Sequence, residues 1–373
     1  MGSHLRNRLG MRLSKSFKTR ISGLMALDLT ISVALCTFNG ARFLRAQLRS
    51  IAAQSRTPNE VVISDDASTD ASFEIANQFA REASFPVRVV QNGETLGSTK
   101  NFEKAISLCT GDVIALSDQD DVWHPEKLAC MEKEFCGPTA PTAVFSDADL
   151  IDDSGNTLPM RLWDTFSFGP REQKHFAKGE GFSILIKHPV VTGATMAFRR
   201  RFSDLILPIP PTYVHDSWIS FLMAACGPVG ALPERLMQYR VHSRQQIGPG
   251  LFTLFERIAS AQATGPQFYL EEVARFRQLQ QRLRTCSRRF PILPRVLQEI
   301  GGKISHREHR ARLPVGKVAR IQGVVREILN GGYWCYSEGW KSALKDIVGF
   351  SQMRRDEPVR KGSLTYGQSS ERH

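Results

Sequence analysis

The 373-residue chain lacks any run of about 20 apolar residues, which is the length that a membrane-spanning helix requires. Its longest uncharged stretch runs from Ser217 to Pro233 and is broken by Gly227 and Pro228. Because glycine and proline mark turns, this stretch is expected to form a helix, a turn and a strand. No transmembrane segment is therefore predicted.

The seven cysteines are too few and too scattered to organise the fold. They are odd in number and no two are spaced as CxxC, which argues against a structural zinc site and a disulfide scaffold. The N-terminus is basic, but no apolar core and cleavage site follow it, so a secretory signal is not expected. Reduced thiols in a cytoplasmic protein are the simplest interpretation.

Acidic residues are missing from the first 27 positions, and the chain carries a net charge of +12. Residues 280–330 hold 12 Lys and Arg against three Glu, a net charge of +9. Such a region can be a solvated basic face, or it can bind anionic lipid headgroups or nucleic acid. Since the chain has no zinc-finger or RNA-recognition motif, we expect no nucleic-acid partner and favour an anionic membrane surface.

What the sequence does contain is a regular alternation of β-rich runs and helical spacing from residue 29 to about 150. The expected strands are Leu29–Cys36, Glu60–Ser64, Val87–Val90, Val113–Leu116 and Ala143–Ser146, and the expected helices are Ala41–Ala53, Ser68–Glu82, Thr99–Leu108 and Pro125–Phe135. This alternation predicts an α/β fold with a mostly parallel, Rossmann-like sheet flanked by helices. Ligands in such sheets bind at the carboxyl ends of the strands.

After residue 150 the alternation weakens, and residues 155–190 look rich in loops. A strand at Val190–Phe198, a helix at Asp216–Ala225 and a strand at Arg235–Val241 are expected. Beyond about residue 250 the chain looks helical and basic, with breaks at prolines and glycines.

An acidic segment, Asp118-Gln119-Asp120-Asp121, follows one of the apolar strands. Asp118 and Asp120 lie one residue apart, and two carboxylates so placed can hold a hard divalent cation such as Mg²⁺ or Mn²⁺. The alternative is an ordinary capped turn. The apolar strand before the segment and the sequence Trp-His-Pro after it favour the metal site, in which Asp121 orients the loop.

Two further acidic positions stand where elements begin or end. Asp65 and Asp66 end the second strand, where a carboxylate can accept hydrogen bonds from a nucleotide base or ribose, or can cap a turn. Asp216 begins a helix, as either an N-cap or a general base for an acceptor hydroxyl. His242 follows a strand and is a candidate metal or diphosphate ligand, and Arg240 is a candidate phosphate contact. A structural role is the alternative for both.

Five motifs together resemble family 2 glycosyltransferases, and most closely bacterial rhamnosyltransferase-like members. They are Ile31–Asn39 (ISVALCTFN), Glu60–Asp70 (EVVISDDASTD), Leu96–Phe102 (LGSTKNF), Leu116–Trp123 (LSDQDDVW) and His215–Trp218 (HDSW). The resemblance covers about residues 29–245. It implies a GT-A fold, a divalent cation, a nucleotide-sugar donor and inversion at the anomeric carbon.

The resemblance also implies roles for residues of the donor pocket. Asp66 would contact the nucleotide base, and Thr37 and Asn39 would line the same pocket. Lys100 would help to hold the nucleotide. In the family's motif a glycine is commoner than Ala67, and alanine should be tolerated unless the position requires a positive φ.

At the reacting centre, the resemblance implies that Asp118 faces ribose or metal and that Asp120 is the principal metal ligand. Asp216 would be the catalytic base. Thr192 and Gly193 fall where the family shapes the sugar and acceptor pocket. The QxxRW element of processive synthases is absent, which favours the addition of a single sugar or a few.

These observations predict a basic extension (1–27), a GT-A catalytic domain (28–248) with a nucleotide-sugar-binding half (28–150) and an acceptor half (151–248), and a basic helical region (249–373) that docks at a membrane. The predicted function is inverting, metal-dependent transfer of a sugar to a polysaccharide or lipid-linked saccharide, and the resemblance implies dTDP-rhamnose as the donor. The predicted location is the cytoplasm, including the inner face of the plasma membrane. Two alternatives are a nucleotidyltransferase and a catalytically inactive membrane scaffold.

Overall fold

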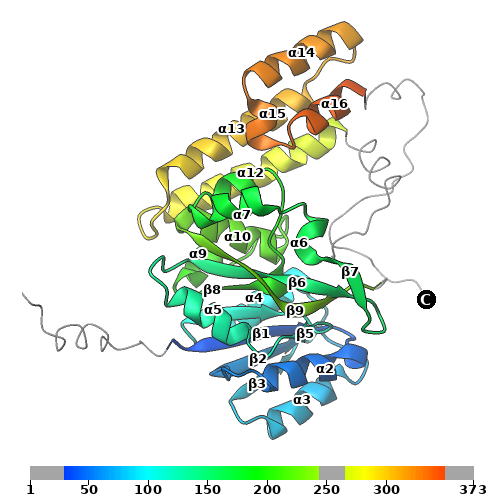
Figure 1. The fold of residues 1–373 in the computed structure, drawn as a ribbon, viewed down its shortest axis with the longest axis vertical. Helices are drawn as coiled ribbons and strands as arrows, with labels where there is room; N and C mark the ends of the chain where they lie inside the picture. The colour runs from blue at the N-terminus through cyan, green and yellow to red at the C-terminus, as the bar shows by residue number, and fades with distance from the viewer. Residues whose placement is uncertain (1–28, 243–264, 349–373) are drawn as a thin grey trace, which may run out of the picture.

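The computed structural model describes residues 29–242 and 265–348, and within them one mixed sheet of nine strands positions the other elements (Figure 1). The strands are β1 (Ile31–Thr37), β2 (Glu60–Asp65), β3 (Val87–Gln91), β4 (Val113–Ser117), β5 (Val122–Trp123), β6 (Ala143–Ile151), β7 (Thr157–Arg161), β8 (Met196–Arg199) and β9 (Val229–Arg240). The order is β3-β2-β1-β4-β8-β6-β9-β5, and β7 pairs with β6. This confirms the predicted α/β architecture.

The half of the sheet formed by β3, β2, β1 and β4 is parallel, as the alternating pattern predicts. Beyond it the sheet is mixed. β8 runs antiparallel to both β4 and β6, β9 runs parallel to β6, and β5 runs antiparallel to β9. The carboxyl ends of β1, β2 and β4 therefore meet at one edge, which is where the acidic residues of the sequence lie.

Helices cover both faces of the sheet, so its strands are apolar on both sides. The helices up to β9 are α2 (Ala41–Ala52), α3 (Ser72–Glu82), α4 (Ser98–Leu108), α5 (Lys127–Phe135), α6 (Leu162–Thr165), α7 (Pro170–Ala177), α8 (Gly181–Leu185), α9 (Ser203–Ile206) and α10 (His215–Cys226). In β1, Val33 and Leu35 face the core cluster under α2, α3 and α5, whereas Ala34 and Cys36 face the cluster under α4 and α10.

Helix α3 begins at Ser72, four residues later than predicted. Ser68 does not cap it; its hydroxyl instead accepts a hydrogen bond from the amide of Asn39 at 2.9 Å. Asp70 accepts the amide of Ser72 at 2.9 Å and that of Ala41 at 3.0 Å. The segment between β2 and α3 is thus a turn that ties β1 to β2, and local spacing alone does not reveal that link.

The region 155–190 is more ordered than predicted, because it contains β7, α6, α7 and α8. Its aromatic residues pack on the sheet, with Trp163, Phe168 and Phe176 around Phe145. The predicted strand at Val190–Phe198 is wrong at its start, since residues 193–195 form a 3-10 turn and β8 begins at Met196. The apolar and β-branched residues just before Met196 therefore reflect burial in the core and not pairing with another strand.

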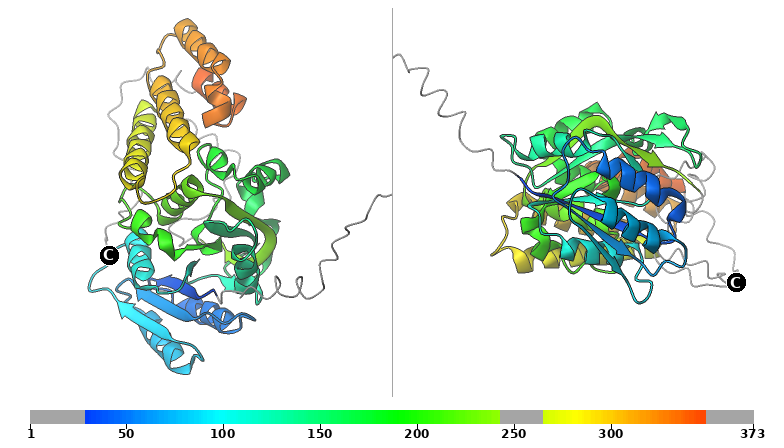
Figure 2. Two further views of the ribbon diagram at one scale, coloured as in Figure 1. Left: turned by 90° about the vertical axis from the view of Figure 1, so that its left-hand side faces the viewer. Right: turned by 90° about the horizontal axis from the view of Figure 1, so that it is seen from below.

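Between residues 265 and 348 the structure contains five helices: α12 (Pro266–Cys286), α13 (Pro294–Ala311), α14 (Lys317–Leu329), α15 (Gly332–Tyr336) and α16 (Trp340–Val348). Phe276, Leu279 and Leu283 of α12 join the core cluster that also contains α10. Figures 1 and 2 show α14 to α16 stacked at the end of the molecule opposite α2 and α3. The predicted helical character of this region is confirmed; residues 1–27, 249–264 and 349–373 of the predicted organisation lie outside the described residues.

Among the described residues, no helix is both long enough and apolar enough to cross a bilayer.

Candidate active site

The acidic segment is fastened to the end of β1 through Gln119. The side-chain oxygen of Gln119 accepts hydrogen bonds from the Thr37 hydroxyl at 2.7 Å and the Phe38 amide at 2.8 Å, and its amide donates to the Phe38 carbonyl at 3.1 Å. A Cβ added at Gly40 would lie 1.9 Å from the Gln119 oxygen. A side chain at residue 40 would therefore displace the Gln119 side chain that links the two strand ends.

Both oxygens of the Asp66 carboxylate accept hydrogen bonds from the loop that precedes α4. One accepts the Leu96 amide at 2.8 Å and the Asn92 side chain at 2.7 Å, and the other accepts the Gly97 amide at 2.8 Å. Asp66 is also buried. In this structure it therefore shapes the loop before α4, and its contact with a nucleotide base stays a prediction.

Two residues of the same strand ends adopt left-handed backbone angles. Asn39 has φ of 47° and Ala67 has φ of 57°. The Asn39 side chain accepts the Thr69 amide at 2.9 Å, which holds the β1 exit against the β2 exit. Asparagine tolerates this conformation, but a β-carbon makes it costly for alanine. The position therefore requires a positive φ, which is the case in which alanine was expected to be unfavourable.

Lys100 lies on the first turn of α4, but its ammonium group faces other protein groups. It donates to Glu103 at 2.8 Å and to the Ile209 carbonyl at 2.9 Å. These contacts link α4 to the segment before α10. The predicted nucleotide contact of Lys100 stays a prediction.

Asp118 and Asp120 follow β4, and their charges act on each other. Burial, followed by the negative charges of Asp120 and Asp216, raises the pKa of Asp118 to about 7. A carboxyl group surrounded by like charges is stabilised in its ionised form by a bound cation. Asp216, which lies about a hundred residues further along the chain, thus acts on the same acidic centre.

The end of β9 closes the other side of the acidic segment. His242 Nε2 lies 2.8 Å from Asp120 Oδ2, so the structure brings together two of the predicted metal ligands. Arg240 donates to the Asp120 carbonyl at 2.8 Å and to the Asp152 carbonyl at 2.9 Å, and its amide donates to Asp121 at 3.1 Å. Asp121 thereby orients the loop, as predicted from the sequence.

The turn at Thr192 and Gly193 packs against the start of α10. A Cβ at Gly193 would lie 2.6 Å from His215 Nε2 and 3.5 Å from the Cβ of Asp216. His215 is buried, stacks on Phe102 with ring centroids 4.0 Å apart, and has no hydrogen-bond partner at either ring nitrogen among the described residues. The Thr192 hydroxyl likewise has no partner there. Three buried polar atoms without a partner, two on His215 and one on Thr192, thus lie where this turn meets the start of α10.

Lys127 is a fully buried cation under this site. Its ammonium group donates to the Ala194 carbonyl at 2.6 Å and lies 4.1 Å from the centre of the Trp123 ring. Burial lowers its pKa to about 7, although the charges of Asp121 and Asp118 act in the opposite direction. Lys127 therefore joins the 192–195 turn to the acidic segment and balances part of its charge.

The comparisons with known proteins identify this arrangement. Residues 32–206 match the family described as Glycosyl transferase family 2, and they carry β1 through β8 together with the acidic segment. The domain belongs to glycosyl transferase family 2. The match supports a glycosyltransferase rather than the nucleotidyltransferase considered above.

Several relatives support the family 2 assignment. An uncharacterized glycosyltransferase of Nostoc sp. is 28% identical over 242 residues, which cover 62% of this chain and 71% of the relative. The dTDP-rhamnosyl transferase RfbG of Shigella flexneri is 34% identical over 100 residues, or 25% of this chain and 34% of the relative. The abequosyltransferase RfbV of Salmonella typhimurium is 32% identical over 104 residues, which cover 27% and 31% of the two chains.

A solved structure has a similar fold. Residues 1–349 of S. aureus TarS, crystallised with UDP-GlcNAc, give a TM-score of 0.50 at 15% identity and cover 86% of this chain and 89% of that chain. At this identity the likeness concerns the fold. It supports the GT-A architecture.

The donor set of this glycosyltransferase fits Mg²⁺ or Mn²⁺. Among the described residues, no three His, Cys, Asp or Glu side chains are gathered as a complete metal cluster. Mg²⁺ is commonly held by one or two carboxylates together with substrate phosphates and water. Asp118 and Asp120 supply such carboxylates, and His242 is close enough to Asp120 to add a ligand or to orient it.

Sequence reasoning missed several residues on which the glycosyltransferase site depends. Gln119 and Lys127 were not selected, although Gln119 lies inside the acidic segment and Lys127 occupies a buried position of α5. The one available signal for Lys127 was its spacing from Leu128 and Met131 on the apolar face of that helix. Gly40 was not selected either, and the need for a small residue there is evident only from the contact with Gln119.

Proposed function

We propose that this glycosyltransferase transfers a single sugar from a nucleotide-sugar donor to an acceptor hydroxyl with inversion at the anomeric carbon. The observation that carries the proposal is the meeting of three segments, namely the acidic segment, the Thr192–Gly193 turn and the start of α10 with Asp216. A donor pocket and a base are needed on opposite sides of the reacting carbon for one-step displacement.

In the proposed reaction, Asp216 accepts the proton of the acceptor hydroxyl as the acceptor oxygen forms its bond to the anomeric carbon. The bond from that carbon to the donor diphosphate breaks, and the nucleoside diphosphate leaves with the electron pair. Asp118 and Asp120 would hold the divalent cation, which when bound supplies positive charge to the leaving diphosphate. No second catalytic carboxylate is required, because the leaving group is a stable anion.

The remaining predicted residues take supporting roles in this proposal. Thr37, Asn39 and Asp66 shape the nucleotide side of the pocket, and Lys100 belongs to the same side. Thr192 and Gly193 border the sugar and the acceptor, where the Thr192 hydroxyl and the His215 ring nitrogens have hydrogen-bonding capacity to offer. His242 would act on the cation directly or through Asp120.

We further propose a deoxyhexose donor such as dTDP-rhamnose. Two relatives support it, since one is a dTDP-rhamnosyl transferase and the other an abequosyltransferase. Their matches extend over 100 and 104 residues. Because TarS was crystallised with UDP-GlcNAc, UDP-sugars are the donors to test beside dTDP-rhamnose.

The acceptor we propose is a polysaccharide or a lipid-linked saccharide that becomes part of the cell surface. The enzyme would work in the cytoplasm and attach peripherally to the inner face of the plasma membrane, where lipid-linked acceptors are found. The excess of basic residues in the C-terminal helices supports this location.

A scan of nucleotide sugars with Mn²⁺, read as release of nucleoside diphosphate, tests the proposed function. We expect turnover of one donor class that stops when the cation is chelated, and NMR of the product should show the opposite anomeric configuration to the donor. Transfer that survives both Asp120→Ala and Asp216→Ala would overturn the assignment of the site. Retention of the donor configuration would overturn the one-step displacement.

A further inference from the structure

Exposed apolar side chains gather at one end of the molecule. Of the fifteen large apolar side chains that are exposed in the described part of the chain, ten lie between residues 315 and 348. Scattered exposed apolar residues are normal on a protein surface, but a concentration of them marks an interaction site. Helices α14 to α16 therefore carry a surface that the sugar-transfer site does not explain.

The apolar side chains follow helical spacing on the outer faces of two helices. On α14 they are Val318, Ile321, Val325 and Leu329, and on α16 they include Trp340 and Leu344. Leu329 is 80% exposed and Trp340 is 62% exposed. Such stripes at intervals of three and four residues form one continuous apolar face on each helix.

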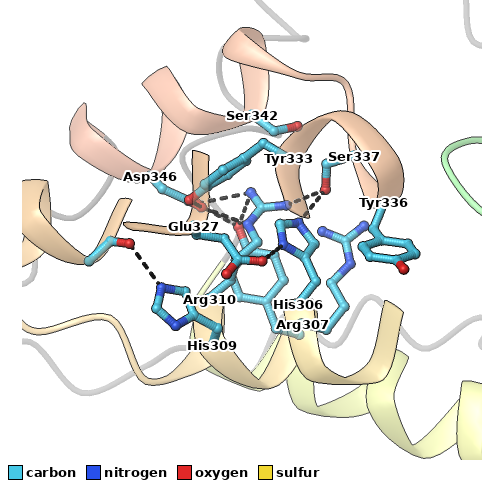
Figure 3. A network of polar contacts seen from close by, with 12 residues as sticks. His306, Arg307, His309, Arg310, Glu327, Tyr333, Tyr336, Ser337, Ser342 and Asp346 are labelled. Atoms are coloured by element: carbon cyan, nitrogen blue, oxygen red, sulfur yellow. Dashed lines mark hydrogen bonds and ion pairs between the residues drawn. The ribbon is translucent and has the colours of Figure 1, made fainter. Parts of the chain in front are cut away.

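The inner faces of the same helices are already occupied by a polar network (Figure 3). Asp346 of α16 accepts hydrogen bonds from Arg310 at 2.6 and 2.9 Å, from Tyr269 at 2.9 Å and from Tyr333 at 2.6 Å. Glu327 of α14 lies 2.6 Å from the buried ring of His306. Because these contacts fix which side of each helix points inward, the apolar stripes remain outside.

The charges around the stripes are nearly all positive. Among residues 312–348 the exposed charged side chains are Arg312, Lys317, Arg326, Lys341, Lys345 and Glu338. Five are basic and one is acidic, so this surface carries a net charge of +4. Lysine is depleted in protein–protein interfaces, and an isologous contact between two copies would bring the same positive charges together.

From this combination we infer that the outer faces of α14 and α16, which we call the α14–α16 surface, dock on an anionic lipid bilayer. Amphipathic helices lie in the bilayer interface with the apolar face immersed and basic side chains at the headgroups. Trp340 and Trp334 suit the boundary between apolar and wet layers. Lys317, Lys341 and Lys345 are long enough to reach anionic headgroups while their stems cover apolar surface.

The inference names the surface through which the membrane location proposed above would be reached, and in that respect it rests on the proposed function. Its test reads binding to vesicles and not sugar transfer. A protein that binds vesicles through this surface but turns over no nucleotide sugar would leave the inference intact and remove the proposed function. A protein that turns over a nucleotide sugar but does not bind vesicles through this surface would remove the inference and leave the proposed function intact.

The experiment sediments the full-length chain with vesicles of phosphatidylcholine, with and without phosphatidylglycerol. We expect binding only to the anionic vesicles, and weaker binding at high salt because salt screens the attraction. The variant Leu329→Ser with Trp340→Ser should bind at least about tenfold more weakly, since two apolar side chains no longer enter the bilayer. Both positions are exposed, so the fold should be retained, which circular dichroism checks.

Matched variants separate the docking surface from general surface effects. Met160→Ser removes an exposed apolar side chain of β7 and should leave binding unchanged. Lys341→Gln with Lys345→Gln should weaken binding to anionic vesicles, whereas Arg81→Gln with Lys133→Gln removes two exposed positive charges elsewhere and should not.

Three results would overturn the inference. The first is equal binding to neutral and anionic vesicles, and the second is unchanged binding of the Leu329→Ser, Trp340→Ser variant. The third is a concentration-dependent increase in mass, measured by light scattering, that this variant abolishes. That result would assign the surface to a second copy of the chain.

Discussion

Ala67 holds a backbone conformation that its side chain disfavours, with φ of 57°. It lies in the turn between β2 and α3, next to Asp66 and to Ser68, whose hydroxyl binds the Asn39 amide. The left-handed region costs a residue with a β-carbon about 1–2 kcal/mol relative to glycine. The turn is kept because the hydrogen bonds across the β1 and β2 exits outweigh this cost.

We therefore expect Ala67→Gly to raise the free energy of unfolding by about 1 kcal/mol, less the greater chain entropy of an unfolded glycine. Urea unfolding measures the change. Ala46→Gly serves as the control, because Ala46 is exposed in the interior of helix α2 and its replacement should lower stability. A loss of stability in the Ala67→Gly variant would show that the positive φ is not a strained feature of the turn.

Gly193 determines how closely the 192–195 turn approaches the start of α10. A methyl group at this residue would lie 2.6 Å from His215 Nε2, and His215 cannot retreat because it stacks on Phe102. We expect Gly193→Ala to displace His215 and Asp216, and to lower sugar transfer at least about a hundredfold. Steady-state transfer and circular dichroism together distinguish a displaced site from an unfolded chain.

The control for that substitution is Gly301→Ala in α13, where a Cβ would meet no atom within 4 Å. It adds the same methyl group to a helix and should leave transfer unchanged. Equal activity of the two variants would mean that the turn yields and that Gly193 does not set the position of Asp216.

At the scale of single elements, Glu60 joins three strands at the end opposite the active site. Its carboxylate accepts hydrogen bonds from the Ser32 hydroxyl at 2.5 Å and from the amide and hydroxyl of Thr110 at 2.5 and 2.9 Å. Burial alone would raise the pKa of Glu60, but these hydrogen bonds outweigh it and hold the pKa below its ordinary value. The ionised form is therefore the one that the fold stabilises.

The direction of this shift predicts a pH dependence. Because the folded-state pKa is depressed, the stabilisation is complete above the ordinary glutamate pKa and is lost as pH falls through the folded value. Glu60→Gln should cost about 1–2 kcal/mol at about pH 7 and less at about pH 3.5. Urea unfolding at both pH values tests this, and Glu74→Gln is the control. A cost that does not shrink in acid would contradict it.

The C-terminal helices are held by a buried ion pair rather than by a large apolar core. Their own cluster comprises Leu313, Val324, Tyr333 and Ala343, whereas Arg310 and Asp346 are 4% and 2% exposed at their side chains. Removing one member of a buried pair leaves the other charge uncompensated and typically costs about 3–5 kcal/mol. The polar network is thus where this layer is most vulnerable.

Asp346→Ala should therefore unfold α16 and α14 locally while nucleotide binding at the distant sheet edge persists. Hydrogen exchange resolves the two regions, and protection should fall in residues 317–348 but not in β1 or β4. Asp204→Ala is the control, because it breaks the exposed pair with Arg289, which contributes about 1 kcal/mol or less. Uniform loss of protection across the chain would show that the helices and the sheet unfold as one unit.

The elements predicted from the sequence are those that local pattern can specify. β1, β2 and β4 are continuous apolar runs, and α4 and α10 have clear helical spacing, so each was placed within a few residues. The elements between residues 155 and 190 were not predicted, because their order comes from Trp163 and Phe168 packing on Phe145. Packing against a distant strand leaves no periodic signal in the segment itself.

The candidate site could likewise be predicted only in part from the sequence. Asp118, Asp120 and Asp216 could be selected because their residue types and their places at element ends suggest chemistry. The contacts that assemble them join residues far apart in the chain, such as Thr37 with Gln119 and Lys127 with Ala194. Only the folded sheet shows that these pairs meet, and only the fold explains why residues 40 and 193 are glycine.

Over the whole molecule, the structure separates the chemistry from the surface that we assign to the membrane. The acidic segment follows β4 and Asp216 lies at the start of α10, whereas α14 to α16 lie at one end of the molecule (Figure 1). α12 connects the two through the core cluster that it shares with α10. A membrane attachment at this end would hold the enzyme near lipid-linked acceptors without occupying the donor pocket.

The most direct measurement of the central claim is sugar transfer by Asp216→Asn, recorded beside Mn²⁺-dependent binding of the nucleoside diphosphate from the donor that the scan identifies. The account predicts that binding stays within about twofold of the unaltered enzyme while transfer falls by about 10² to 10⁴, the usual contribution of a general base. Asp120→Asn should instead lose the Mn²⁺ dependence of binding. Transfer by Asp216→Asn at the unaltered rate would contradict the account.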